Sequence, residues 1–119
     1  MLLVRAESYA RKNLTEAAGE DLTLLQENRM ALTPAEIQQV MALSKDELLD
    51  VILQERRKEL VFRGLRWIDI RRLNSEGIQS ITLKRVLGDS VYSFASEMVP
   101  TYTFKIPTEV IDLSGIAQN

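Results

Sequence analysis

The sequence contains no cysteine and no histidine among its 119 residues. Their absence excludes disulfide frameworks, catalytic thiols, imidazole ligation of haem, zinc fingers and the Ser-His-Asp triad, since each requires one of these two side chains. Long hydrophobic runs are also missing, because no segment approaches the roughly 20 apolar residues that span a bilayer. Any catalysis would therefore have to rest on carboxylates, lysine, tyrosine or hydroxyl groups.

The chain also lacks an excess of one charge. It has 15 Lys and Arg against 17 Asp and Glu, which gives a net charge of −2. Nucleic-acid binders concentrate positive charge against phosphates, so we expect no nucleic-acid partner. Met1 is followed by a few apolar residues and then by Arg5, so residues 1–10 have neither the basic start nor the apolar core of a signal peptide.

The length suits one domain of mainly α structure with a small β part. Apolar spacing and turn residues divide the chain into a helix pair at 1–30, a helical core at 33–74, a hairpin and extended strand at 78–107, and a tail at 108–119. Asn13 separates the two helices of the pair, and the tail is expected to hold one helical turn at 109–113.

Two helix starts stand out in the helical core. Thr33 and Pro34 open a short helix, because threonine caps the first turn and proline suits the first helical position. Ser44 and Glu47 have the spacing of a capping box at the start of the longest helix. We expect this helix to run to about residue 63, with Gly64 following its end.

The sequence pattern changes again after the predicted end of the longest helix at Gly64. Residues 67–73 are expected to form another short helix, ended by Asn74 and Gly77. Residues 81–86 and 91–94 alternate as strands around a Gly88-Asp89 turn, which predicts a hairpin. Residues 101–106 are predicted as a further extended run.

Two carboxylates on the longest helix are candidate chemical groups. Leu48, Ile52, Glu55, Glu59 and Phe62 follow steps of four and three, so they share one stripe of the helix. Glu55 and Glu59 could act as an acid and base or as metal ligands. The favoured interpretation is structural, in which Arg66, Arg71 or Arg72 compensates their charge.

Residues 63–72 are rich in arginine and could bind an anion. Asp69 and the two glutamates would neutralise most of this charge, which favours a solvated or paired surface. Aromatic residues could instead stack on sugar rings, but we expect a core role for each, because large aromatics dominate cores. The candidates are Trp67, Tyr92, Phe94, Tyr102 and Phe104.

Residues 48–72 closely resemble the C-terminal signature of the SusD/RagB family, ERR-x-EL-x-F-x-G-x-R, then an aromatic and D-[LI]-x-R. Residues 3–17 are similar to the family's last tetratricopeptide-type helix pair, and residues 104–110 to its closing PIP-x-E segment. Gln118-Asn119 also matches the QN with which family members often end. The positions that carry the signature are Glu55, Arg56, Glu59, Gly64, Arg66, Trp67, Asp69 and Arg72.

The resemblance implies a mainly helical, tetratricopeptide-like scaffold and a binding protein, not an enzyme. Members are surface lipoproteins of the Bacteroidetes outer membrane that bind glycans or other nutrients. They hand oligosaccharide to a SusC-type TonB-dependent transporter. The resemblance implies no catalytic residue, metal or cofactor. It implies that the signature is a structural motif, and it identifies no glycan-contacting residue in this chain.

Family members are several times longer, so we expect this chain to be a C-terminal portion, which would explain the absent signal peptide and lipidated cysteine. An uncovered helix face would then favour self-association. Arg63 stands where the family commonly has glutamate, and Leu113-Ser114-Gly115 where Asn-Pro is usual. Two alternatives remain open: a free-standing tetratricopeptide-like interaction module, and a carboxylate enzyme that uses Glu55 and Glu59.

Overall fold

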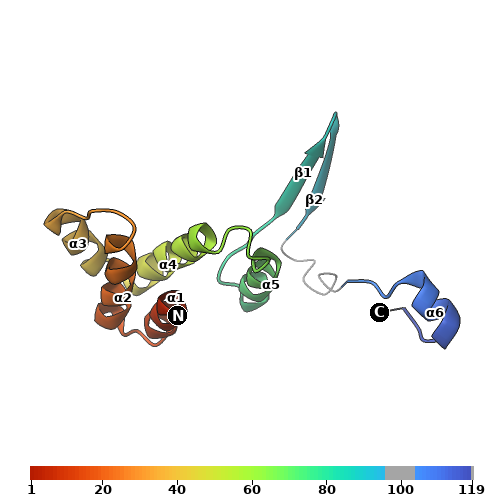
Figure 1. The fold of residues 1–119 in the computed structure, drawn as a ribbon, viewed down its shortest axis with the longest axis horizontal. Helices are drawn as coiled ribbons and strands as arrows, with labels where there is room; N and C mark the ends of the chain where they lie inside the picture. Colours follow the sequence, from red (N-terminus) through yellow and green to blue (C-terminus); the bar gives the residue numbers. More distant parts are fainter. Residues whose placement is uncertain (96–103, 119) are drawn as a thin grey trace. The chain divides into compact units, whose positions relative to one another are not determined.

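A computed structural model describes residues 1–95 and 104–118. Within them lie six helices and one two-stranded antiparallel sheet (Figure 1). The predicted fold class, mainly α with a small β hairpin, is confirmed. The chain divides into two compact units, residues 1–64 and 65–119, and each is described by itself.

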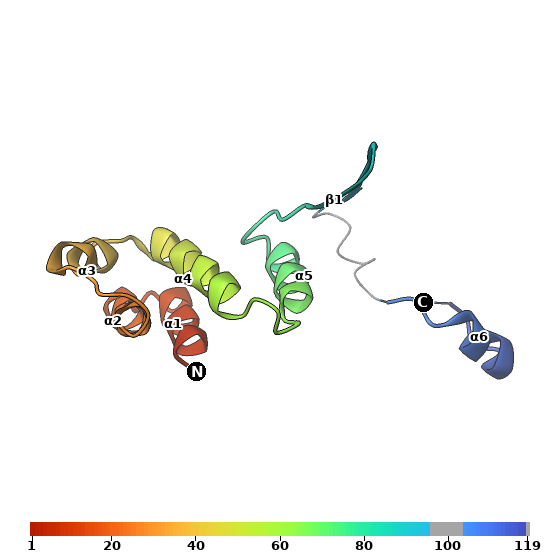
Figure 2. The same ribbon diagram turned by 45° about the horizontal axis from the view of Figure 1, so that its top comes forward.

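The first unit is built on a helix pair. Helix α1 (Leu2–Arg11) packs against α2 (Thr15–Glu27), and the two lie side by side in Figures 1 and 2. Asn13 lies between them with a left-handed φ of 62°, a conformation that asparagine tolerates better than most residues. The separation predicted at Asn13 is therefore confirmed, and the left-handed residue reverses the chain within three residues.

Two further helices complete this unit. Helix α3 (Pro34–Met41) packs on α2, and α4 (Lys45–Glu59) packs on both α1 and α2. The core between the helices is apolar and rich in alanine, and small side chains let the helix backbones approach closely. Its buried members are Leu3, Ala6, Ala10, Ala18, Leu22, Leu48, Leu49, Ile52 and Leu53.

Both predicted helix starts form as hydrogen-bonded caps. The Thr33 hydroxyl accepts from the Glu36 backbone N–H at 3.4 Å, and the Thr33 backbone N–H donates to the Glu36 carboxylate at 2.8 Å. A capping box also forms at α4, where the backbone N–H and the hydroxyl of Ser44 donate to Glu47 Oε2 at 3.0 and 2.6 Å. These bonds satisfy donors that helix starts otherwise leave unpaired.

The end of α4 differs from the prediction. The helix stops at Glu59 instead of about residue 63, and Leu60 is its C-cap. Phe62 then adopts a left-handed φ of 61° and is fully exposed, so it does not continue the buried stripe of Leu48 and Ile52. Gly64 also has a left-handed φ, of 72°, but it belongs to the turn after the helix and not to its cap.

The second unit contains α5, a hairpin and a short last helix. Helix α5 (Arg66–Glu76) is longer than the predicted 67–73, so Asn74 lies inside it and does not end it. The helix ends at Gly77, which takes the left-handed φ of 69° that suits a glycine C-cap. Strands β1 (Leu83–Leu87) and β2 (Ser90–Phe94) pair around Gly88 and Asp89, as predicted. Helix α6 (Thr108–Ser114) extends the helical turn expected at 109–113.

The extended run predicted at 101–106 is only partly described. Residues 101–103 lie outside the described residues, and residues 104–107 have no regular secondary structure. Within 1–95 and 104–118, no helix has both the length and the hydropathy to cross a membrane.

The core packing predicts a large cost for removing one central side chain. Ile52 is fully buried, so Ile52→Ala should lower the free energy of unfolding by about 2–5 kcal/mol through lost burial and a cavity. Val4→Ala on the exposed face of α1 should change it by less than about 0.5 kcal/mol. Urea unfolding followed by the helical circular dichroism signal measures both, and equal effects would contradict the assignment of the core.

The caps predict a loss of stability in acid. Hydrogen bonds from the Ser44 hydroxyl and backbone lower the pKa of Glu47 below its usual 4.5. The carboxylate therefore stabilises the fold fully above pH 4.5, and this contribution disappears as the pH falls through the lowered folded-state pKa. The difference in melting temperature between wild type and Glu47→Gln should be positive at pH 7 and shrink toward pH 3. A difference that stays constant would contradict the cap.

Candidate functional site

The candidate site is the signature segment, residues 55–72, and its residues fall in two units. Glu55, Arg56, Glu59 and Gly64 belong to the first unit, and Arg66, Trp67, Asp69 and Arg72 to the second. Each group is therefore described within its own unit.

Glu59 lies in a guanidinium fork. Arg29, which follows α2, donates from Nε to Glu59 Oε1 at 2.9 Å and from Nη2 to Glu59 Oε2 at 2.6 Å. The hydrogen bond and the charge of Glu59 raise the pKa of Arg29 above its ordinary value. Such two-point pairs are more specific in geometry than a single contact, so Glu59 ties the end of α4 to the end of α2.

Glu55 pairs within its own helix. Its Oε1 accepts a hydrogen bond from Lys58 Nζ at 2.6 Å, and its side chain is largely buried while that of Lys58 is exposed. The predicted partners Arg66, Arg71 and Arg72 belong to the second unit, so their pairing with Glu55 or Glu59 stays a prediction. Within the first unit the carboxylates are paired with Arg29 and Lys58, which sequence reasoning did not indicate.

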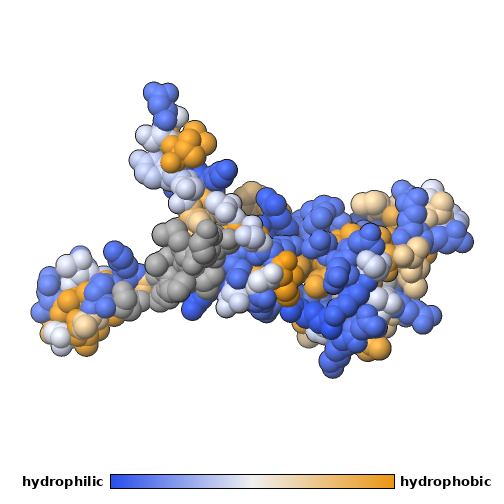
Figure 3. Space-filling model, turned by 180° about the vertical axis from the view of Figure 1, so that it is seen from behind, coloured by the Kyte–Doolittle hydropathy of each residue, from blue (hydrophilic) through white to orange (hydrophobic). Residues whose placement is uncertain are grey.

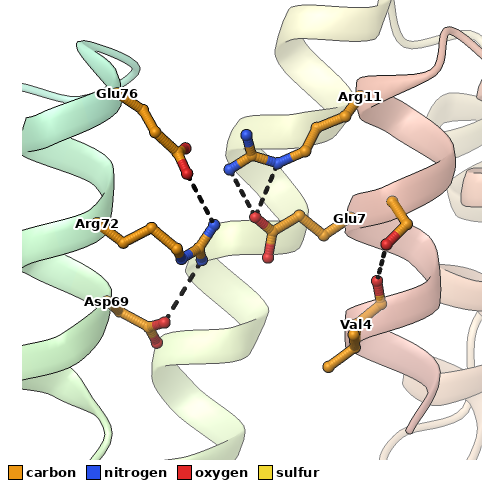
Figure 4. Close-up of polar contacts among 7 residues, drawn as sticks. Val4, Glu7, Arg11, Asp69, Arg72 and Glu76 are labelled. Carbon is orange, nitrogen blue, oxygen red and sulfur yellow. Dashed lines mark hydrogen bonds and ion pairs between the residues drawn. The ribbon is translucent and has the colours of Figure 1, made fainter.

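Two more ion pairs hold the first unit together near its core. Arg5 donates through a two-point contact to Asp21, with Nε at 2.7 Å from Oδ2, and Asp21 is buried. Arg11 donates from both Nε and Nη2 to Glu7 Oε1, at 3.0 and 2.7 Å (Figure 4). Burying a carboxylate is costly unless it is paired, so Arg5 and Arg11 offset the cost of burying Asp21 and Glu7.

Three charged side chains of α5 form a row of ion pairs along one face of the helix. Arg72 lies between Asp69 and Glu76, with Nη2 at 3.4 Å from Asp69 Oδ1 and Nη1 at 3.9 Å from Glu76 Oε1 (Figure 4). The spacings of three and four place all three side chains on one face. Asp69 is buried, so Arg72 compensates a carboxylate that water reaches poorly.

The aromatic residue of the signature is packed among other rings. Trp67 is half-buried, and its ring centroid lies 5.9 Å from that of Phe104 and 6.1 Å from that of Phe94. These distances are within the range of favourable aromatic pairs. The core role predicted for Trp67 and Phe94 agrees with this packing, since both are half-buried. The same prediction was wrong for Tyr92 and Phe104, which are exposed, and Tyr102 lies outside the described residues.

Sequence reasoning missed the link between α5 and the hairpin. The Asn74 side chain donates from Nδ2 to the Ile81 carbonyl at 2.9 Å and accepts from the Ile81 N–H at 2.8 Å. Asn74 was predicted only as the residue that ends a helix. The two-way amide contact also orients the chain that enters β1, and no local pattern signals a contact over seven residues.

The chemistry of these groups is pairing. Glu55, Glu59 and Asp69 each face a cation. Among residues 1–95 and 104–118 there is no cluster of three acidic side chains that could hold a metal ion. The arrangement can hold helices in register.

Comparison with known proteins identifies this architecture. The sequence model of the family described as the SusD family matches residues 1–112 of this chain. The matched range includes both helices of the pair, the whole signature and the hairpin. This is a family of binding proteins without catalytic function, and the match supports a SusD-like glycan-binding protein in general. Searches of curated proteins and of solved structures gave no match.

The aromatic packing predicts a local spectroscopic change. Trp67 is the sole tryptophan, so its fluorescence reports on this cluster alone. Phe104→Ala should move the emission maximum of Trp67 to longer wavelength, because water replaces the stacked ring. Tyr92→Ala, at an exposed aromatic outside the cluster, should leave the emission unchanged, and a similar shift in both variants would contradict the packing.

Proposed function

Because this chain belongs to the SusD family, we propose that it is the C-terminal scaffold region of a cell-surface glycan- or nutrient-binding lipoprotein of the Bacteroidetes outer membrane. In this proposal the protein works with a SusC-type TonB-dependent transporter in the uptake of oligosaccharides. The scaffold holds the shape of the protein, and residues outside the signature recognise the glycan.

The proposal rests on the family match together with the ion pairs that the signature residues form. The match covers residues 1–112, and the charged signature residues Glu55, Glu59, Asp69 and Arg72 are engaged in ion pairs with other residues of the chain. Charged groups that neutralise one another inside a fold are poor candidates for ligand contacts, since a ligand would have to replace a well-oriented partner. This supports a scaffold role for the segment.

The aromatic residues lead to the same assignment. Sugar-binding platforms need an open ring face, and the Trp67 ring is stacked at 27° to Phe104 and tilted against Phe94. These neighbours occupy positions that a pyranose ring would need. We therefore propose that Trp67 stabilises the second unit and does not stack on sugar.

The proposal predicts little glycan binding by residues 1–119 alone. Isothermal titration calorimetry of this chain with a panel of oligosaccharides should show no saturable heat at millimolar ligand. Tight binding of any oligosaccharide would place the recognition site inside this region. In that case the variants Trp67→Ala and Tyr92→Ala would distinguish a site at the packed cluster from one at the exposed ring.

The proposal also predicts a transporter partner. The gene product that contains residues 1–119, tagged in the cells that make it and purified from detergent-solubilised outer membranes, should bring a TonB-dependent transporter with it. Mass spectrometry of the purified material identifies the partner. Recovery from the soluble fraction with another protein partner would support the alternative of a free-standing interaction module.

A further inference from the structure

The hairpin β1–β2 exposes apolar side chains on both faces. Val86, Leu87, Val91 and Tyr92 are between 51% and 66% exposed, and Figure 3 shows hydrophobic side chains at the surface of this hairpin. In the described part of the chain the sheet has only these two strands. A two-stranded sheet is at best marginally stable in water, so this hairpin would gain stability from a further strand.

The register determines which backbone groups are available for such a strand. Leu87 and Ser90 flank the two-residue turn and form a hydrogen-bonded pair, and pairs alternate along an antiparallel ladder. Val86 with Val91 and Lys84 with Ser93 are therefore non-hydrogen-bonded pairs. Consequently the N–H and C=O groups of Val91 and Ser93 point away from β1, toward the outer edge of β2.

The two edges of the hairpin differ in charge. β1 carries Lys84 and Arg85, and charged residues, lysine above all, discourage pairing of an edge strand with another strand. β2 reads Ser-Val-Tyr-Ser-Phe from Ser90 to Phe94 and contains no charged residue. If an added strand pairs with this hairpin, the β2 edge is the favourable one.

We propose that a second copy of this chain pairs with the β2 edge, strand against strand about a twofold axis, to give a four-stranded antiparallel sheet. The β2 edge is complementary to itself. With Tyr92 opposite the same residue of the second copy, Val91 of each copy faces Ser93 of the other, and the outward N–H and C=O groups form four hydrogen bonds.

The side chains favour the same register. Tyr92 and its symmetry mate form a non-hydrogen-bonded pair across the axis, in which side chains approach most closely, and aromatic cross-strand pairs are stabilising. The corresponding twofold pairing of β1 would set Arg85 opposite Arg85, and like charges directly opposite are destabilising. This interaction surface is separate from the scaffold role proposed above and does not depend on it.

Two proline variants test this proposal on the full 119-residue chain. Lys84 and Ser93 are cross-strand partners, so each has its N–H on an outer edge and neither donates to the β1–β2 ladder. Ser93→Pro removes two of the four intermolecular hydrogen bonds, and Lys84→Pro removes none. Sedimentation equilibrium should show a wild-type dimer, a dimer weakened about tenfold or more by Ser93→Pro, and little change with Lys84→Pro.

Tyr92→Lys provides a test that does not rely on proline, since it sets two ammonium groups opposite each other and should also weaken the dimer. Amide hydrogen exchange should show concentration-dependent protection at Val91 and Ser93 and none at Lys84 and Val86. A monomer at all concentrations overturns the proposal, even if Val91 and Ser93 are protected, since another part of the same chain then covers the edge. A dimer equally strong in Ser93→Pro and Tyr92→Lys overturns it as well, because the copies then associate through another surface.

Discussion

The packing of α4 on the α1–α2 pair is the constraint on which the rest of the first unit depends. Ile52 and Leu48 of α4 are almost completely buried in a core that α1 and α2 line with Ala6, Ala10 and Ala18. Alanines at these positions remove the side-chain bulk that would hold helices apart, so the apolar stripe of α4 reaches the pair. Once α4 lies there, Glu59 is within reach of Arg29, and the charged end of the helix becomes a second point of attachment.

Local patterns predicted the parts of the fold that local interactions decide. Both helix caps, the turn at Gly88 and the helix end at Gly77 depend on residues within four positions of one another, and each forms as expected. The predicted end of α4 was wrong because the helical periodicity was extended past Leu60. The helix ends at Glu59, and Phe62 in the turn that follows takes a left-handed φ, which helical periodicity does not signal for an aromatic residue.

The partners of the signature carboxylates required the tertiary structure. Arg29 and Glu59 are 30 positions apart, and nothing in the spacing of either residue distinguishes this pair from the nearer arginines 66, 71 and 72. The exposure of the hairpin was missed for a similar reason, because alternation of apolar residues predicts a strand but does not say what covers its faces. The family resemblance was carried by residue identities in residues 48–72, and the match over residues 1–112 confirms it.

The central claim is that the signature acts as a scaffold through its ion pairs, with Glu59 and Arg29 as the pair that joins α4 to α2. A double-mutant cycle of Arg29→Ala and Glu59→Gln, followed by urea unfolding at low and high salt, tests it most directly. Each single variant should be less stable than wild type, the double variant should be little worse than either, and the coupling should shrink in salt because Arg29 is exposed. Strictly additive effects at both salt concentrations would contradict the claim.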